Sequence, residues 1–235
     1  MSLATLSGHN VATARVELPA FGIWYADVAT EDAAAFPLGS AVTLTIAGLV
    51  LAGRAFRGEV YQGAGGYRIE GGAGGWRLPV RARSHQDDSG VRLAHVLAAV
   101  LSDMPAASRE SFVGAPVTGG AAGIPAAADR SLGDHWMRRA GVASSSLALL
   151  AVPWYMRPDG ATYCGARPSG AVADPQYDVT EPVDPGARRV TIATERPELW
   201  VPGLTLTDPH LASPLLLRHV TIAVDSDTMR IEVTG

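Results

Sequence analysis

The fold is decided by the stretch from Ala41 to Arg83, AVTLTIAGLVLAGRAFRGEVYQGAGGYRIEGGAGGWRLPVRAR. Short runs of alternating β-type residues recur in it, and glycine separates them again and again. We expect these glycines to supply positive φ angles at turns, or bulges that bend the sheet, at Gly53, Gly58, Gly63, Gly65 and Gly66. The stretch predicts a curved sheet or barrel with no cleft-forming helix, no nucleophile and no metal ligands.

Two further strands are predicted before this stretch. Residues 11–19 alternate, so that one face carries Ala12, Ala14, Val16 and Leu18 and the other carries Thr13, Arg15 and Glu17. Residues 22–28 follow as a second strand, with Trp24, Ala26 and Val28 on one face. The alternation in residues 11–19 predicts a half-buried strand.

A helical region follows Arg83. The segment VRLAHVLAAVLSDM predicts a helix, with Asp88 or Ser89 as its N-cap and Pro105 as its stop. Residues 106–129 read as a loop with one short strand around 111–117. We expect a short helix over 135–139, capped by Ser131, and a second helix over 142–151.

The last third of the sequence returns to strands. Residues 154–157 and 161–166 predict a hairpin, because Pro158-Asp159-Gly160 supplies the turn chemistry between them. A terminal β block is expected over residues 190–194, 203–207, 219–224 and 229–233. In its last hairpin, Val220, Ile222 and Val224 should oppose Met229, Ile231 and Val233.

These segments predict a mainly β protein with an α+β insertion, in which two related β-barrel modules flank a small helical region. The expected boundaries are 1–86 for the first barrel module, 87–152 for the insertion, and 153–235 for the hairpin and second barrel module.

Composition excludes several function classes. The net charge is −4, which gives no electrostatic footprint for nucleic acid. Every cation is arginine, so lysine chemistry is absent, and the single cysteine, Cys164, excludes an intrachain disulfide or paired-thiolate zinc. No apolar run is long enough to span a bilayer, and the N-terminus predicts no signal peptide.

The candidate motifs for chemistry are weak. The clusters at Gly63–Gly66 and Gly71–Gly75 resemble phosphate loops. Strands predicted over 67–70 and 76–80 follow them where a helix should begin, so we interpret the clusters as turns. No histidine stands in a metal-binding spacing. We therefore expect no catalytic, cofactor-binding or metal-binding residue.

Tryptophan and arginine allow two interpretations each. The five tryptophans suit a core or subunit interface better than stacking platforms for sugars, at Trp24, Trp76, Trp136, Trp154 and Trp200. Even spacing places Arg77, Arg81 and Arg83 on one face of a predicted strand. That face is either solvated or a contact with another subunit.

Taken in order, six phrases resemble the baseplate hub proteins of tailed bacteriophages, a family related to late-control D proteins and VgrG spikes. They are VTLTIAGLVLAGRAFRGEV, YRIEGGAGGWR, VRLAHVLAAVLSDM, WMRRAGVASSSLALLA, WYMRPDGATYCGARP and RRVTIATERPELWVPGLTL. The resemblance covers the chain from about residue 11 onward, and it rests on the order of the phrases.

The resemblance implies a homotrimer whose two barrels per chain form a pseudo-sixfold ring, joining a sixfold tail tube to a threefold spike without catalysis or cofactors. The implied partners are a tail tube or distal tail protein and a spike, which should be a separate chain because this sequence ends at Gly235. The implied location is the tail baseplate of the virion, after assembly in the host cytoplasm. No membrane insertion or sequence-specific nucleic acid binding is expected.

Two alternatives stay open. One is a tail-associated cell-wall hydrolase whose acid and base come from Glu17, Asp27, Asp87, Asp88 and Asp134. The other is a carbohydrate- or receptor-binding tail module that uses exposed tryptophan.

Overall fold

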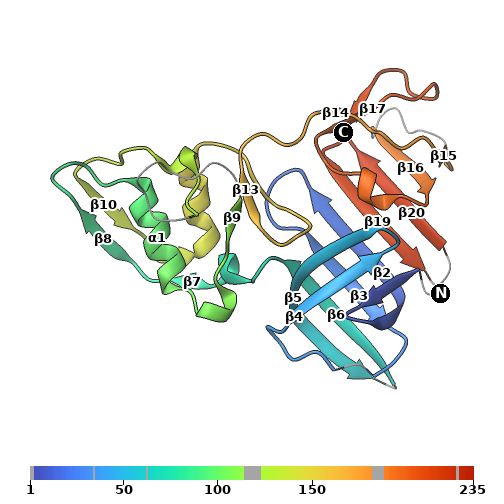
Figure 1. The fold of residues 1–235 in the computed structure, drawn as a ribbon, viewed down its shortest axis with the longest axis horizontal. Helices are drawn as coiled ribbons and strands as arrows, with labels where there is room; N and C mark the ends of the chain where they lie inside the picture. Colours follow the sequence, from blue (N-terminus) through green and yellow to red (C-terminus); the bar gives the residue numbers. More distant parts are fainter. Residues whose placement is uncertain (1–2, 34, 62, 114–122, 182–187, 226–227) are drawn as a thin grey trace. The chain divides into compact units, whose positions relative to one another are not determined.

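A computed structural model describes residues 3–33, 35–61, 63–113, 123–181, 188–225 and 228–235. The chain divides into two compact units (Figure 1). The barrel unit comprises Met1–Gly71 and Arg167–Gly235, and the inserted unit comprises Gly72–Ala166. Strands dominate the described residues, so the expected mainly β class with an α+β insertion is confirmed.

A closed six-stranded barrel forms the first part of the barrel unit. Its strands are β1 (Ala4–Leu6), β2 (His9–Pro19), β3 (Tyr25–Thr30), β4 (Ala41–Ile46), β5 (Leu49–Tyr61) and β6 (Ala64–Gly71). They lie in the order β1-β4-β5-β6-β3-β2, and β1 also pairs with β2, which closes the ring. The alternating apolar residues of these strands fill the interior, with Leu6, Val16, Leu44, Leu51 and Ile69 all fully buried.

Strand β2 connects the barrel to the terminal strands. Its start pairs with β1, and its stretch from Thr13 to Pro19 pairs with β19 (His219–Asp225). Beyond β19 the sheet continues through β20 (Thr228–Thr234), β16 (Arg189–Thr194) and β15 (Tyr177–Val179). A separate small sheet contains β14 (Gly170–Ala171), β17 (Leu204–Leu206) and β18 (Leu215–Leu216), and η5 (Pro197–Leu199) precedes β17. The barrel and the terminal strands are therefore one continuous ten-stranded sheet.

The inserted unit packs short strands and turns around one helix, α1 (Leu93–Asp103). Its strands pair as β8 (Arg83–Gln86) with β10 (His135–Arg138), β7 (Pro79–Val80) with β11 (Gly141–Val142), and β13 (Thr162–Cys164) with both β12 (Trp154–Met156) and β9 (Phe112–Val113). Its 3-10 turns are η1 (Gly75–Arg77), η2 (Ala106–Ser108), η3 (Ala126–Ala128) and η4 (Ala143–Leu150).

Most predicted strands are confirmed. The hairpin at Asp159-Gly160 forms as expected, with Gly160 at φ 81° and the Asp159 carboxylate accepting the amide of Ala161. In the last hairpin Val220 pairs with Val233 and Ile222 pairs with Ile231. The helix predicted over 91–104 is confirmed as α1, but its N-cap is Arg92, which makes no side-chain capping bond. Neither Asp88 nor Ser89 caps it.

Three predicted elements differ from the structure. The segment expected as a helix over 135–139 is strand β10, because its residues pair with β8. The helix expected over 142–151 is present over Ala143–Leu150, but as the 3-10 helix η4 and not as an α-helix. The strand expected over 76–80 begins as the turn η1, so Arg77, Arg81 and Arg83 do not share a strand face. Of the short strand expected around 111–117, β9 is seen, and 114–117 lie outside the described residues.

The face assignment in β2 also needs two corrections. A register shift between Val11 and Thr13 takes Ala12 out of the inward row, although Ala14, Val16 and Leu18 are buried as expected. Glu17, expected on the exposed face, is only 7% exposed, because side chains of the adjoining strand β19 cover and bind it.

The strand glycines make room for aromatic rings more than they turn the chain. Of the five glycines singled out, only Gly63 has a positive φ, at 85°. A Cβ at Gly65 would lie 2.5 Å from the Tyr67 ring, and one at Gly71 would collide with the Trp24 indole. At these glycines aromatic rings pack directly against the backbone. This close packing allows the barrel to close tightly.

The boundaries of the two units differ from the expected 87–152 insertion. Residues 72–86 join the inserted unit because β7 and β8 pair with β11 and β10. The hairpin of β12 and β13 joins it because β13 pairs with β9. The helical region is thus the centre of a larger inserted unit.

Candidate functional site

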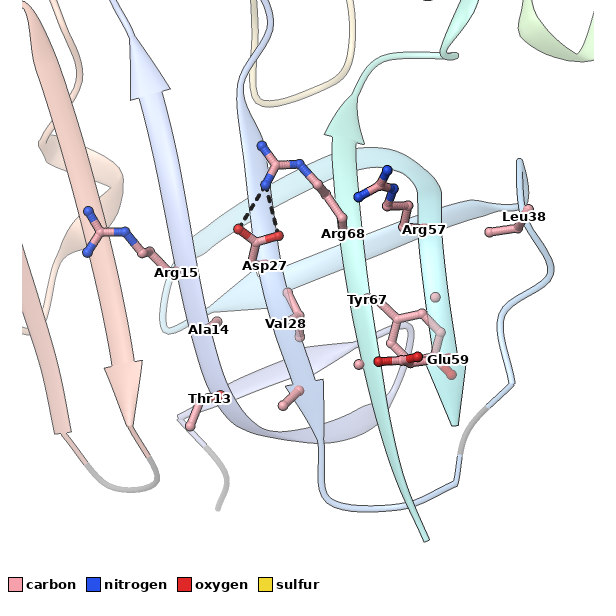
Figure 2. A pocket seen from close by; sticks show the side chains of 13 residues that line it. Thr13, Ala14, Arg15, Asp27, Val28, Leu38, Arg57, Glu59, Tyr67 and Arg68 are labelled. Atoms are coloured by element: carbon pink, nitrogen blue, oxygen red, sulfur yellow. Dashed lines mark hydrogen bonds and ion pairs between the residues drawn. The ribbon is translucent and has the colours of Figure 1, made fainter. Parts of the chain in front are cut away.

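The outward side of the continuous sheet, which we call the outer face, carries a row of charges across four strands. Cross-strand pairing places Arg57 of β5 next to Arg68 of β6, Asp27 of β3 and Arg15 of β2. Figure 2 shows their side chains on the same side of the strands. Three cations and one anion therefore stand in line on an exposed surface.

A shallow hollow of about 760 Å³ follows this row. Ala29 and Gly66, which are small, leave space between the charged side chains, and Leu38 stands at the rim with 69% of its surface exposed. A Cβ at Gly66 would meet no atom within 4 Å, so the hollow is open there. The geometry suits contact with another macromolecule better than enclosure of a small substrate.

The two central charges of the row bind each other. Arg68 Nη1 donates to both carboxylate oxygens of Asp27, at 3.1 and 3.0 Å, and its guanidinium lies 4.2 Å from the centre of the Tyr25 ring. The side chain of Arg57 has no hydrogen bond or ion pair within the described part of the chain, although Arg57 pairs with Arg68 across the strands. Adjacent like charges on paired strands are unfavourable, so Arg57 is available to an anionic partner.

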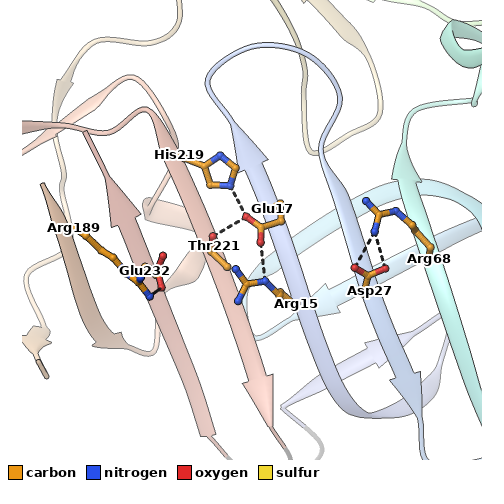
Figure 3. Close-up of polar contacts among 8 residues, drawn as sticks. All are labelled: Arg15, Glu17, Asp27, Arg68, Arg189, His219, Thr221 and Glu232. Atoms are coloured by element: carbon orange, nitrogen blue, oxygen red, sulfur yellow. Dashed lines mark hydrogen bonds and ion pairs between the residues drawn. The ribbon is translucent and has the colours of Figure 1, made fainter. Parts of the chain in front are cut away.

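Glu17 is the centre of a second polar cluster on the outer face (Figure 3). Its carboxylate accepts bonds from Arg15 Nε at 2.7 Å and Thr221 Oγ1 at 2.7 Å, and it contacts His219 Nε2. Burial by itself raises the pKa of Glu17, but the bonds from Thr221 and His219 and the charge of Arg15 outweigh it and hold the pKa below its usual value. The cluster ties the barrel strand β2 to the terminal strand β19.

The candidate carboxylates for hydrolysis are divided between the two units. Glu17 and Asp27 lie in the barrel unit, whereas Asp87, Asp88 and Asp134 lie in the inserted unit, where the amide of Asp87 donates to the carbonyl of Asp134 at 3.1 Å. The pKa of Asp87 is lowered, chiefly by the hydrogen bonds that Ser89 donates to it. Neither Glu17 nor Asp87 has the raised pKa that a general acid needs, and Asp27 is bound by Arg68.

The glycine loop at Gly71–Gly75 does bind an anion, but one from this chain. Backbone amides of Ala73, Gly75 and Trp76 donate to the Glu110 carboxylate at 3.1, 2.7 and 3.4 Å. Burial raises the pKa of Glu110, and these amides oppose that shift. Sequence reasoning missed Glu110; the available signal was that Glu110 is the one acidic residue in the sequence from Met104 to Ala128.

The tryptophans are mainly structural. Trp24, Trp76 and Trp200 are at most 1% exposed, which removes them as sugar platforms, while Trp136 and Trp154 are half-buried. Trp76 Nε1 donates to Thr162 at 2.7 Å and Trp200 Nε1 donates to Asp174 at 2.9 Å. These hydrogen bonds fix the Trp76 indole within the inserted unit and the Trp200 indole within the barrel unit.

Within the described residues, no cluster of three or more histidine, cysteine, aspartate or glutamate side chains could hold a metal ion. None of their helices combines the length and apolarity needed to cross a bilayer. Burial raises the pKa of the Cys164 thiol to about 12.

The fold has clear counterparts among solved structures. No protein-family model matches the sequence, and no curated protein matches it. Three solved structures each match 98% of this chain. The E. coli c3393 protein, described as a type VI secretion component similar in structure to the T4 bacteriophage tail proteins gp27 and gp5, has 12% identity and a TM-score of 0.62, with 75% of its own length covered.

The other two are tail proteins. The 43 kDa tail protein of prophage MuSo2 from Shewanella oneidensis has 9% identity and a TM-score of 0.60 over 95% of its length. The tail protein from Neisseria meningitidis MC58 has 13% identity and a TM-score of 0.58 over 94% of its length. This is the fold of phage tail proteins. The resemblance seen in the sequence is confirmed at that level.

Proposed function

We propose that this chain is a non-enzymatic structural protein of a phage tail or a related injection device, and that it acts as the baseplate hub. In this proposal three copies form a ring that joins a sixfold tail tube to a threefold spike carried by another chain. The matched tail-protein fold supports a place in the tail, and the gp27 similarity described for the E. coli protein supports the hub.

The observation that carries the ring is the ten-stranded sheet, which closes on itself at one end and stays open at the other. β1 seals the barrel by pairing with both β2 and β4, whereas β15 has one partner, β16, among the described strands. An open edge exposes backbone groups that a neighbouring chain can bind. We infer that a second copy covers β15.

A second barrel module is part of the same proposal. The strands β19, β20, β16 and β15, together with the small sheet of β14, β17 and β18, would form a barrel-like counterpart to the first barrel. Two such modules in each of three chains give six similar units around one axis, which is the symmetry that a sixfold tube requires.

The oligomer can be measured by light scattering and native mass spectrometry. A trimer has three times the 24.4 kDa mass of the chain. A chain that stays monomeric at high concentration, and also with its tail tube and spike partners present, would overturn the hub.

A proline at the sheet edge tests where the copies meet. Thr180 donates its amide to Thr191 of β16, and ladder bonds alternate, so the amide of Val179 points to the open side of β15. Val179→Pro should remove that donor, keep the monomer folded and weaken the trimer. Asp178→Ala, which leaves the edge amides in place, is the control. A trimer unchanged by Val179→Pro would exclude this edge without excluding the hub.

A further inference from the structure

A hollow of about 480 Å³ in the inserted unit is lined by three arginines and one aspartate. Arg81 and Arg83 come from the segment that follows β7, Asp103 ends α1, and Arg138 ends β10. Three guanidinium groups against one carboxylate leave the lining with an excess of positive charge. The sequence had suggested Arg81 and Arg83 as a subunit contact, and the structure places them here.

Arg138 is buried with its hydrogen bonding incomplete. Only 5% of its side chain is exposed, Nε donates to the carbonyl of Arg81 at 3.1 Å, and Nη2 donates to Asp103 at 2.5 Å. The remaining nitrogen, Nη1, is buried without a hydrogen-bond partner among the described residues. A buried guanidinium N–H without an acceptor is costly, and native proteins usually satisfy such a group with a bound ion or water.

The negative charge at the hollow is also too small to balance its arginines. Arg83 lies 3.9 Å from the second carboxylate oxygen of Asp103, so two guanidinium groups share one carboxylate. Arg81 is exposed beside them. Arginine presents a planar fork of donors that matches an oxyanion in two-point contact, which suits this arrangement better than scattered point charges would.

The neighbouring strand pair of β8 and β10 places further polar groups on the same side. Alternation places Arg83 and His85 of β8 on one face with Trp136 and Arg138 of β10, and His85 pairs directly with Trp136. His85 Nε2 and Trp136 Nε1 are also buried without a partner among the described residues. Burial lowers the pKa of His85, and Arg83, Arg138 and His95 lower it further, whereas Asp103 alone opposes them. The local field is therefore positive.

We propose that this hollow is a binding site for an oxyanion, held by Arg81, Arg83 and Arg138. The oxyanion is a carboxylate or a phosphate, because both present two acceptor oxygens at the spacing of a guanidinium fork. It can be supplied by an acidic side chain of another tail protein or by free phosphate. The site is independent of how many copies form the ring.

The test is calorimetric titration of the full chain with inorganic phosphate and, separately, with a tetraglutamate peptide, at constant ionic strength. Arg81→Ala combined with Arg83→Ala removes two exposed guanidinium groups and leaves the carbonyl that holds Arg138. We expect saturable binding that weakens at least about tenfold in this double variant. The matched control is Arg218→Ala with Arg230→Ala, which removes the same charge from exposed positions of the barrel unit.

The titrant identifies the source of the oxyanion. Binding of the peptide alone assigns the site to a partner's carboxylate, and binding of phosphate alone assigns it to the free ion. Equal weakening in both double variants, or no saturable heat up to roughly 20 mM phosphate and peptide, would mean an adventitious ion only and would overturn the site.

A second measurement does not depend on the variants. The indole N–H resonance of Trp136 should shift on titration while that of Trp24, buried in the barrel unit, stays in place. If both indoles shift alike, or neither shifts while heat is released, binding is elsewhere and the assignment is wrong.

Discussion

The carboxylate of Glu110 accepts the backbone amide of Gly75 at 2.7 Å, inside a loop whose sequence looks like a phosphate site. Ala73 and Trp76 donate to the same carboxylate, so the glycine-rich loop is closed by an anion from its own chain. The hydrogen bonds to Glu110 therefore hold the loop in place within the inserted unit.

Replacing this anion should destabilise the inserted unit. Glu110→Gln places an amide donor where the Ala73 N–H now donates, which leaves buried donors without acceptors. We expect a loss of about 1–3 kcal/mol in the free energy of unfolding, measured by urea denaturation. Asp88→Asn, at an exposed position of the same unit, should change stability by less than about 0.5 kcal/mol. Equal stability of the two variants would contradict this stabilising role of Glu110.

Two neighbouring glycines of β6 should respond oppositely to alanine. A Cβ at Gly65 would lie 2.5 Å from the Tyr67 ring and 2.7 Å from Thr30 Oγ1, whereas one at Gly66 would meet nothing within 4 Å. Gly65→Ala should therefore cost about 1–3 kcal/mol, and Gly66→Ala should be neutral or slightly stabilising. Thermal unfolding of both variants compares them directly, and a similar loss in each would argue that glycine flexibility, not space, is what β6 needs.

The Glu17 cluster should make the free energy of unfolding depend on pH in the acidic range. Because the folded pKa of Glu17 is lowered, its contribution is complete above the usual pKa and is lost as pH falls through the folded pKa. Glu17→Gln should cost about 1–3 kcal/mol at neutral pH and flatten the acid slope. Urea denaturation between neutral and acidic pH measures the free energy of unfolding, with Glu59→Gln, at an exposed position, as the control. An unchanged slope in Glu17→Gln would refute the assignment.

Cys164 should be nearly inert in the folded chain. With its pKa raised to about 12, the thiolate fraction at mildly alkaline pH falls by about three orders of magnitude relative to an ordinary cysteine. A thiol-disulfide reagent should react slowly with the native protein and stoichiometrically after denaturation. Rapid native labelling would show that the thiol is not buried as described.

The positions of most strands could be predicted from the sequence, because apolar alternation and turn residues are local signals. Val220 and Ile222 oppose Val233 and Ile231 as their spacing requires, and Asp159-Gly160 turns its hairpin. The segment at His135–Arg138 was misassigned because its partner, β8, lies about fifty residues away in the sequence. Pairing over that distance overrides local helix preference.

The polar clusters could not be predicted from the sequence, for a related reason. Glu17 meets Thr221 across 204 positions, and Arg138 meets Asp103 across 35. Nothing within a short window distinguishes these residues from solvated charges, since their burial arises only when distant strands and α1 pack around them.

Three properties can be predicted from the sequence alone: the mainly β class, the places where glycines interrupt the strands, and the absence of lysine and paired-cysteine chemistry. Other properties appear only in the folded chain. The Ala41–Arg83 stretch is divided between two units, its strand glycines contact Tyr67 and Trp24, and its last arginines line a hollow with Arg138. Strand formation follows from local patterns, whereas closure, burial and charge clustering depend on which distant segments come together.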